Sequence, residues 1–167
     1  SLSDVISFGV APGILIYLWG TFELGSLGWS MSLFFVICSA LRLARFTADI
    51  YIVPKNIDSK IYFIGVPSPG AAGLCLLPVF IVFEFDFLFF RNPYFNIINL
   101  LLVGFMMISK IPTFSLKSIN FNRKYSAWII LVIAIICISL LSNLLMTLIL
   151  LLITYIISIV FTVLKKI

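Results

Sequence analysis

The sequence is poor in charged residues and contains no histidine. Only 10% of its 167 residues are Asp, Glu, Lys or Arg, whereas 63% are hydrophobic. Soluble domains carry about 25% charged residues, so this composition excludes a protein whose surface faces water throughout. The lack of histidine removes the commonest metal ligand, and the three cysteines, Cys38, Cys75 and Cys137, lack zinc-binding spacing. We interpret these cysteines as small residues that lie in lipid or in the protein core.

Long apolar segments take up most of the chain, whose mean hydropathy is +1.26. A helix of about 20 apolar residues spans the hydrocarbon core of a bilayer. We expect such helices near residues 5–22, 27–46, 68–90, 94–111, 126–141 and 145–164. The last two come from one run, 126–164, which is too long for a single crossing. We expect this run to fold back at its polar cluster, Ser139, Ser142 and Asn143.

Backbone groups inside a bilayer must be hydrogen-bonded within the protein, so these segments are expected to be helical. A transmembrane β-barrel would need alternating stretches of about 10 residues, and these runs are uniformly apolar. The predicted fold class is therefore all-α, polytopic integral membrane, with six transmembrane helices in one domain, 1–167. Gly9, Pro12 and Gly13 predict kinks in the first helix, and Pro78 predicts one in the third.

Lys and Arg gather on one side of this predicted bundle. Of the 11 Lys and Arg residues, all but Arg91 fall after the second helix, after the fourth helix or at the C-terminus. The positive-inside rule makes that side cytoplasmic, so both ends of the chain are predicted to face the cytoplasm. In a membrane protein, a net charge of +5 suggests phospholipid headgroups or a phosphorylated substrate as partner, and no nucleic acid.

This topology brings several polar features to the cytoplasmic end: Asp4, the pair Arg42 and Arg45, and the Gly/Pro/Ser-rich segment 63–73. Ionisable groups near a bilayer are costly enough to suggest function. Simpler interpretations stay open, because arginines also reach to the membrane surface as anchors. Asp4 could act as a helix cap or favourable dipole charge, and the small residues of 70–73 could serve close helix packing.

Three blocks in this order and spacing resemble the phosphatidylserine synthases of the CDP-alcohol phosphatidyltransferase family: SLSDVISFGVAP (1–12), ALRLARF (40–46) and YFIGVPSPGAAG (62–73). The resemblance is strongest over 1–75. It implies transfer of a phosphatidyl group from CDP-diacylglycerol to L-serine, with release of CMP, at the cytoplasmic leaflet of the inner membrane. It also implies Mg²⁺ or Mn²⁺ as cofactor, membrane lipid as a partner and a possible homodimer.

The resemblance assigns roles to four residues. Asp4 corresponds to the last aspartate of the family signature, D-x-x-D-G-x-x-A-R followed by G-x-x-x-D-x-x-x-D, and would be the catalytic base or a metal ligand. Arg42 and Arg45 would bind phosphate or the serine carboxylate. Ser68, in the PSPGAAG block, would border the same substrate-binding site.

The first part of that signature does not occur in this sequence. We therefore expect the chain to be the C-terminal part of a longer protein of about eight helices, and to be inactive alone. Two alternatives remain. One is a related transferase with another acceptor, such as glycerol phosphate or inositol phosphate. The other is a non-enzymatic membrane protein such as a transporter subunit, although the internal repeats common in transporters are not found in the sequence.

Overall fold

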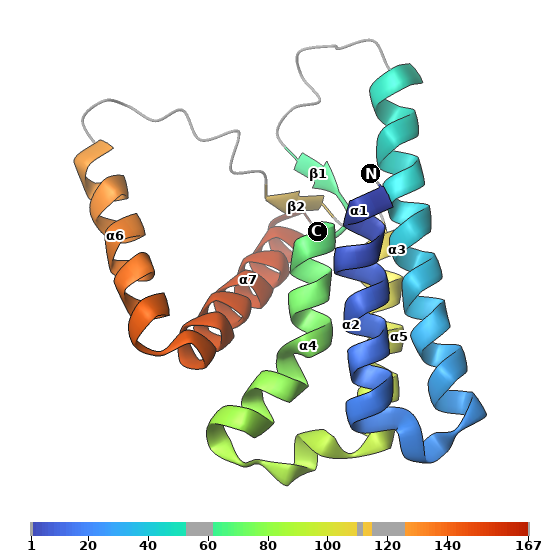
Figure 1. Ribbon diagram of the computed structural model, residues 1–167. Coiled ribbons are helices and arrows are strands. Elements are labelled where there is room, and N and C mark those ends of the chain that lie inside the picture. The colour runs from blue at the N-terminus through green and yellow to red at the C-terminus, as the bar shows by residue number, and fades with distance from the viewer. Residues whose placement is uncertain (1, 53–61, 110–111, 115–125, 167) are drawn as a thin grey trace.

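The computed structural model describes residues 2–52, 62–109, 112–114 and 126–166 (Figure 1). The first helical segment consists of α1 (Leu2–Val5), η1 (Ile6–Val10), α2 (Ala11–Ile16), η2 (Tyr17–Thr21) and η3 (Phe22–Leu24). The others are α3 (Ser26–Ile52), α4 (Ser68–Phe85), η5 (Leu88–Arg91), α5 (Pro93–Ile108), α6 (Ser126–Ser142) and α7 (Leu144–Lys166).

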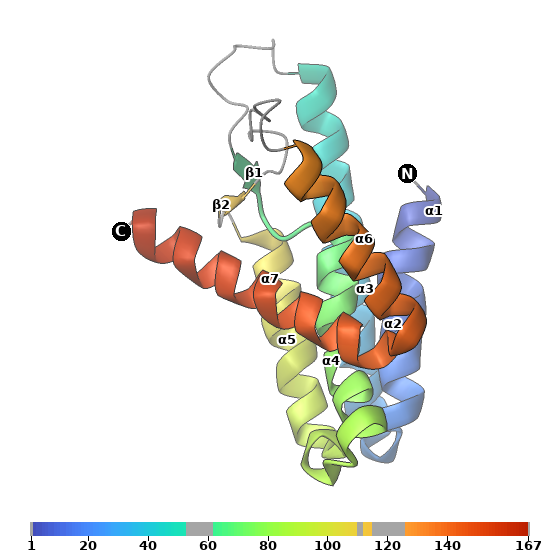
Figure 2. The same ribbon diagram turned by 90° about the vertical axis from the view of Figure 1, so that its left-hand side faces the viewer.

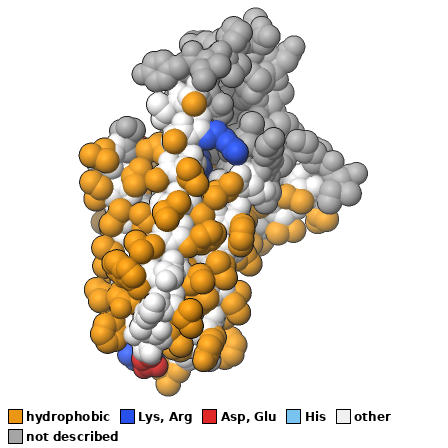
Figure 3. All heavy atoms as spheres, turned by 90° about the vertical axis from the view of Figure 1, so that its right-hand side faces the viewer, with side chains coloured by type: hydrophobic (Ala, Val, Ile, Leu, Met, Phe, Trp, Pro, Cys, Tyr) orange, Lys and Arg blue, Asp and Glu red, His pale blue; other side chains and the backbone are white. Residues whose placement is uncertain are grey.

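Six apolar helical segments therefore lie where hydropathy predicts them. Four of them are long and apolar enough to cross a membrane: Leu2–Leu24, Ser26–Ala48, Ser68–Phe85 and Leu144–Leu164. The other two, α5 with 16 residues and α6 with 17, are shorter. Hydrophobic side chains cover the bundle along its length on the face shown in Figure 3. The predicted all-α membrane class is confirmed, and the chain is an integral membrane protein.

The first helix is irregular at the predicted place. Pro12 lies in the first turn of α2, and a π-helical turn precedes it, closed by the Ala11 N–H that donates to the Ile6 carbonyl. Such turns are rare insertions in helices. This helix packs closely on α3, because Ser32 Oγ donates to the Gly13 carbonyl at 2.6 Å. A Cβ at Gly9 would lie 2.8 Å from Ser39 Oγ, so small residues set the separation of the two helices.

α4 continues through Pro78 as one helix. Proline has no N–H, so it leaves the carbonyl four residues earlier without its usual donor. That carbonyl belongs to Leu74, and Asn99 Nδ2 on α5 donates to it at 3.3 Å and to the Cys75 carbonyl at 3.1 Å. The neighbouring helix α5 therefore supplies the hydrogen-bond donor that the Leu74 carbonyl lacks because of Pro78.

The predicted fold-back near Asn143 is present: α6 ends at Ser142 and α7 begins at Leu144. Ser139 Oγ and Thr147 Oγ1 lie 2.8 Å apart across this corner. The two helices form a V that leans away from the bundle in Figure 1, and Figure 2 shows α7 crossing the other helices at a steep angle. α7 packs against α4, whereas α6 packs mainly against α7.

Two boundaries differ from the sequence-based expectation. The helix predicted over 68–90 ends at Phe85, because Asp86 adopts a left-handed conformation (φ 54°) and caps it through its N–H to the Val82 carbonyl. The helix predicted over 27–46 continues to Ile52. A short antiparallel pair of strands was also not expected: β1 (Tyr62–Ile64) aligns with β2 (Pro112–Phe114). This pair lies at the same end of the bundle as α1 and the start of α4 (Figure 1).

Candidate functional site

Arg42 and Ser68 meet where α4 begins. Ser68 is the first residue of α4 and is 7% exposed. Arg42, on α3, donates from Nη1 to Ser68 Oγ at 2.7 Å. The guanidinium of Arg42 is therefore held at the N-terminus of an 18-residue helix, where the helix dipole favours a negatively charged ligand.

Arg45 lies one turn further along α3 and binds a different helix. Its Nη1 donates to the Ile108 carbonyl, at the C-terminal end of α5, at 3.2 Å. A cation is favourable there, since the last carbonyls of a helix carry partial negative charge. Arg42 and Arg45 thus connect α3 to the start of α4 and to the end of α5, and both have a defined protein partner.

Gly65 fixes the segment that leads into α4. Its φ of +83° lies in the left-handed region, and a Cβ there would approach the carbonyl oxygens of Met107 and Ser109 at 2.9 and 3.1 Å. Glycine is the residue that tolerates both conditions. The close approach holds the entrance of α4 against the end of α5, beside the carbonyl that Arg45 binds.

Asp4 is exposed and lies in α1, beside α3, at this same end of the bundle (Figure 1). It makes no hydrogen bond or ion pair with another residue that the structure describes. Topology thus brings Asp4 to the same end as the arginines, as expected, but the described contacts do not join it to them. Its predicted roles as base and metal ligand stay predictions.

Tyr155 on α7 was not singled out from the sequence. Its hydroxyl and the Arg42 Nε are both buried, and neither has a hydrogen-bond partner among the described residues. The two side chains lie close enough to interact electrostatically. Gly70 allows this approach, because a Cβ there would meet the Tyr155 ring at 3.0 Å and its hydroxyl at 3.2 Å.

One sequence signal could have pointed to this tyrosine. Tyr155 is the only tyrosine within the apolar run 126–164, and a buried tyrosine hydroxyl usually has a polar partner. Here the Tyr155 hydroxyl has no such partner among the described residues, and the Arg42 Nε of the same site has none either. The Arg42 Nε–H and the Tyr155 hydroxyl can both donate hydrogen bonds to an anionic oxygen.

The described residues do not by themselves make a site for divalent cations. No group of three Asp, Glu, Cys or His side chains close enough to hold a metal occurs among them. Of the carboxylates with described side chains, Asp4 belongs to α1, at the end of the bundle where α4 begins (Figure 1). Glu23 belongs to η3, after α2, and Glu84 and Asp86 lie where α4 ends, which is the opposite end. Mg²⁺ prefers several oxygen ligands in octahedral geometry, which one aspartate cannot supply.

These features define an α-helical membrane protein with a cationic, hydrogen-bond-donating site at the entrance of one helix. The chain is similar to CDP-diacylglycerol–serine O-phosphatidyltransferases. It is 32% identical over 136 residues to that of Helicobacter pylori (strain ATCC 700392 / 26695), covering 81% of this chain and 55% of the relative. It is 38% identical over 116 residues to that of Methanocaldococcus jannaschii, covering 66% and 45%.

A third relative, from Mycobacterium leprae, is 27% identical over 135 residues, covering 81% of this chain and 45% of the relative. No family model matches the chain. The chain spans about half the length of the curated relatives it matches. These relatives confirm the resemblance that the three sequence blocks indicated, and the chain is a homologue of the CDP-diacylglycerol–serine O-phosphatidyltransferases.

Proposed function

We propose that this chain forms part of an enzyme that transfers the phosphatidyl group of CDP-diacylglycerol to L-serine and releases CMP. The names of its relatives support this reaction. The observation that carries the proposal is the pair of unpartnered donors, Arg42 Nε and Tyr155 Oη, beside Ser68 at the start of α4. A site of this kind suits an anionic oxygen of a phosphate or carboxylate.

In the proposed reaction, the serine hydroxyl attacks the phosphorus that carries the diacylglycerol, and the bond from that phosphorus to CMP breaks. Arg42 binds an oxygen of the phosphate or of the serine carboxylate through its free Nε–H. Ser68 holds the guanidinium from its other side through the 2.7 Å hydrogen bond to Nη1. Arg45 adds a second positive charge, and Tyr155 donates a hydrogen bond from α7.

Asp4 is proposed as the base that accepts the proton of the attacking serine hydroxyl, or as a metal ligand. A carboxylate can accept such a proton when substrate brings the groups together. Mg²⁺ or Mn²⁺ would stabilise charge on the leaving nucleotide when bound. Because the described residues do not suffice to hold such an ion, the requirement for it rests on the family resemblance alone.

The proposal includes an orientation: the end that holds Arg42 and Arg45 faces the cytoplasm, as do both ends of the chain, in the inner membrane. The distribution of Lys and Arg along the sequence supports it. Self-association into a homodimer belongs to the same proposal, by analogy with the family.

The reaction can be tested by following labelled serine in membranes that contain the natural full-length gene product. We expect phosphatidylserine only when CDP-diacylglycerol and a divalent cation are added. Arg42→Lys and Tyr155→Phe should each lower kcat/KM at least about tenfold, since each removes a hydrogen bond to a charged group. Tyr17→Phe is the matched control, because that tyrosine packs on Trp29 near the opposite end.

Three results would contradict this assignment. Turnover of glycerol phosphate or inositol phosphate in place of serine would favour the related transferase. Absence of turnover with every alcohol acceptor would favour a non-enzymatic protein. Full activity of both Arg42→Lys and Tyr155→Phe would show that the substrate does not bind where α4 begins.

A further inference from the structure

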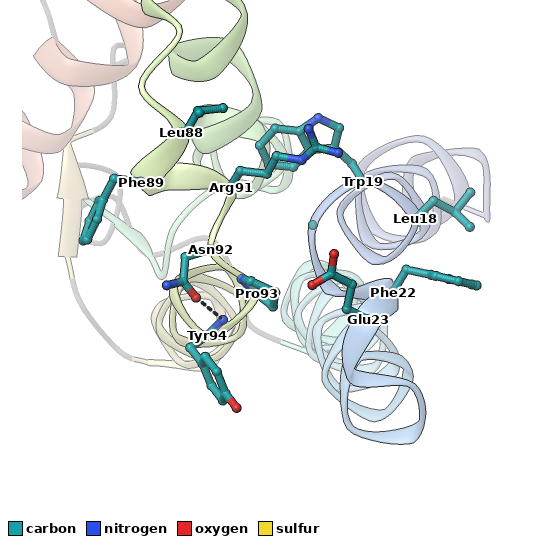
Figure 4. Close-up of a pocket in the computed structure, with 11 residues that line it drawn as sticks. Leu18, Trp19, Phe22, Glu23, Leu88, Phe89, Arg91, Asn92, Pro93 and Tyr94 are labelled. Carbon is teal, nitrogen blue, oxygen red and sulfur yellow. Dashed lines mark hydrogen bonds between the residues drawn. The ribbon is translucent and has the colours of Figure 1, made fainter.

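A second polar site lies at the end of the bundle away from Arg42 and Arg45. It is a cavity of about 600 Å³ between the end of the first helical segment, residues 18–23, and the η5–α5 connection, residues 88–94 (Figure 4). A volume of this size falls in the range of small-molecule sites. None of its residues takes part in the proposed reaction.

Two charged groups of opposite sign enter this cavity from different walls. Glu23 comes from η3 and Arg91 from η5, and Figure 4 shows both side chains in the space between these elements. Neither makes a hydrogen bond or ion pair with another described residue. The neighbouring Asn92 is already used, because its Oδ1 accepts the Tyr94 N–H at 3.1 Å and caps α5. Glu23 and Arg91 are therefore free to bind a ligand that carries both charges.

The rim of the cavity is apolar and aromatic. Phe22 is 62% exposed, Leu88 70% and Tyr94 67%, and Trp19 also lines the wall. Aromatic side chains of this kind favour the boundary between hydrocarbon and headgroups. Figure 3 shows acidic and basic atoms at the lower end of a face on which hydrophobic side chains predominate, with another basic side chain in its upper part. The charges thus lie at a membrane boundary, next to surface suited to acyl chains.

We propose that this cavity binds the headgroup of a zwitterionic phospholipid, with its phosphate at Arg91 and its ammonium at Glu23. The guanidinium suits phosphate oxygens, and the carboxylate accepts hydrogen bonds from a primary ammonium. A soluble zwitterion could satisfy the two charges, but it would leave the exposed apolar rim without a partner. The rim therefore favours a lipid over a soluble molecule with the same polar groups. This inference does not depend on the proposed transferase reaction.

The test is native mass spectrometry of the detergent-purified natural full-length gene product titrated with dioleoyl phosphatidylethanolamine or dioleoyl phosphatidylglycerol. Glu23→Gln should weaken binding of phosphatidylethanolamine about fivefold and leave phosphatidylglycerol unchanged, because only the former has an ammonium. Arg91→Gln should weaken both about fivefold, because both have a phosphate. Glu84→Gln is the control, since Glu84 is an exposed carboxylate at the same end that does not line the cavity.

Unchanged binding of phosphatidylethanolamine in both Glu23→Gln and Arg91→Gln would overturn the proposal. An equal effect of Glu84→Gln would also overturn it, because net charge rather than this cavity would then decide affinity. The last titration uses phosphoethanolamine, which has the phosphate and the ammonium of the lipid but no acyl chains. If it binds as tightly as the lipid, the site takes a soluble zwitterion and the lipid assignment is wrong; much weaker binding supports the lipid.

Discussion

Replacing Asn99 with leucine is predicted to destabilise the protein, and the cost should fall when Pro78 is replaced with alanine. The Asn99 amide donates to the Leu74 carbonyl at 3.3 Å and to the Cys75 carbonyl at 3.1 Å. An α-helix would normally supply the Leu74 carbonyl with the N–H of residue 78. Because proline lacks that N–H, Asn99 supplies the Leu74 carbonyl with the hydrogen-bond donor that α4 itself cannot provide.

The size of the effect follows from these two hydrogen bonds. Side-chain hydrogen bonds between membrane helices contribute about 0.6 kcal/mol each on average, so Asn99→Leu should cost about 1–2 kcal/mol. The Cys75 carbonyl keeps the N–H of Val79 as a donor, whereas the Leu74 carbonyl is left with none. In Pro78→Ala, the new N–H reaches the Leu74 carbonyl, and the penalty of Asn99→Leu should fall by about 0.6 kcal/mol or more.

A double-mutant cycle measures this coupling directly. The wild type, both single variants and the double variant would be unfolded with SDS in mixed micelles and followed by circular dichroism. Val79→Ala provides the matched control background, because it changes a neighbouring side chain of α4 and leaves the backbone donors as they are. An equal cost of Asn99→Leu in the wild-type, Pro78→Ala and Val79→Ala backgrounds would refute the idea that Asn99 compensates for the proline.

Two further predictions concern the ends of the helices. Gly65→Ala should destabilise by about 1–3 kcal/mol in a thermal unfolding assay, because it combines a positive φ with a Cβ 2.9 Å from a carbonyl oxygen. Gly25→Ala is the control: its φ is also positive, but its surroundings are open, so it should cost less in the same assay. A cysteine at Asn143 should react with a membrane-impermeant thiol reagent from the side opposite Arg42, in a background without native cysteines. Labelling from the Arg42 side would contradict the fold-back as a crossing.

Hydropathy was sufficient to predict the helices, because burial in lipid selects apolar residues over the whole length of a segment. It could not predict where α4 ends. Residues 87–90 are as apolar as the helix before them, and the helix stops because Asp86 adopts a left-handed conformation. The β1–β2 pair could not be predicted from the sequence either. Its strands have only three residues each, and they are defined by their pairing with one another rather than by a sequence pattern of their own.

The candidate site was predictable where charge interrupts apolar sequence, and this is how Arg42 and Arg45 were found. Ser68 followed from the family resemblance of its block. Tyr155 could not be found in the same way, because an aromatic residue in an apolar run looks like an ordinary packing residue. Its place beside Arg42 results from the packing of α7 on Gly70, which is a property of the tertiary structure.

Buried polar groups in this bundle have two different roles. Ser32 and Asn99 place hydrogen-bond donors on carbonyls of neighbouring helices, and such pairs hold the helices together. Among the described residues, four buried side-chain atoms lack a partner, and they fall near the two proposed sites. Arg42 Nε and Tyr155 Oη lie at the start of α4. The other two atoms belong to Thr21, the residue after Gly20, and to Asn96, whose side chain lies against Gly20; Gly20 lines the proposed headgroup cavity.

An unpaired buried polar atom is costly in any apolar environment, so these four atoms are unfavourable for folding alone. The cost is offset when a bound ligand supplies the missing partner, as proposed for Arg42 and Tyr155. Thr21 and Asn96 are themselves fully buried and do not line the proposed headgroup cavity, so a ligand bound there would not supply their missing partners. Folding and ligand binding therefore place opposite demands on Arg42 and Tyr155, whose unpaired donors are unfavourable for the fold and available to the proposed ligand.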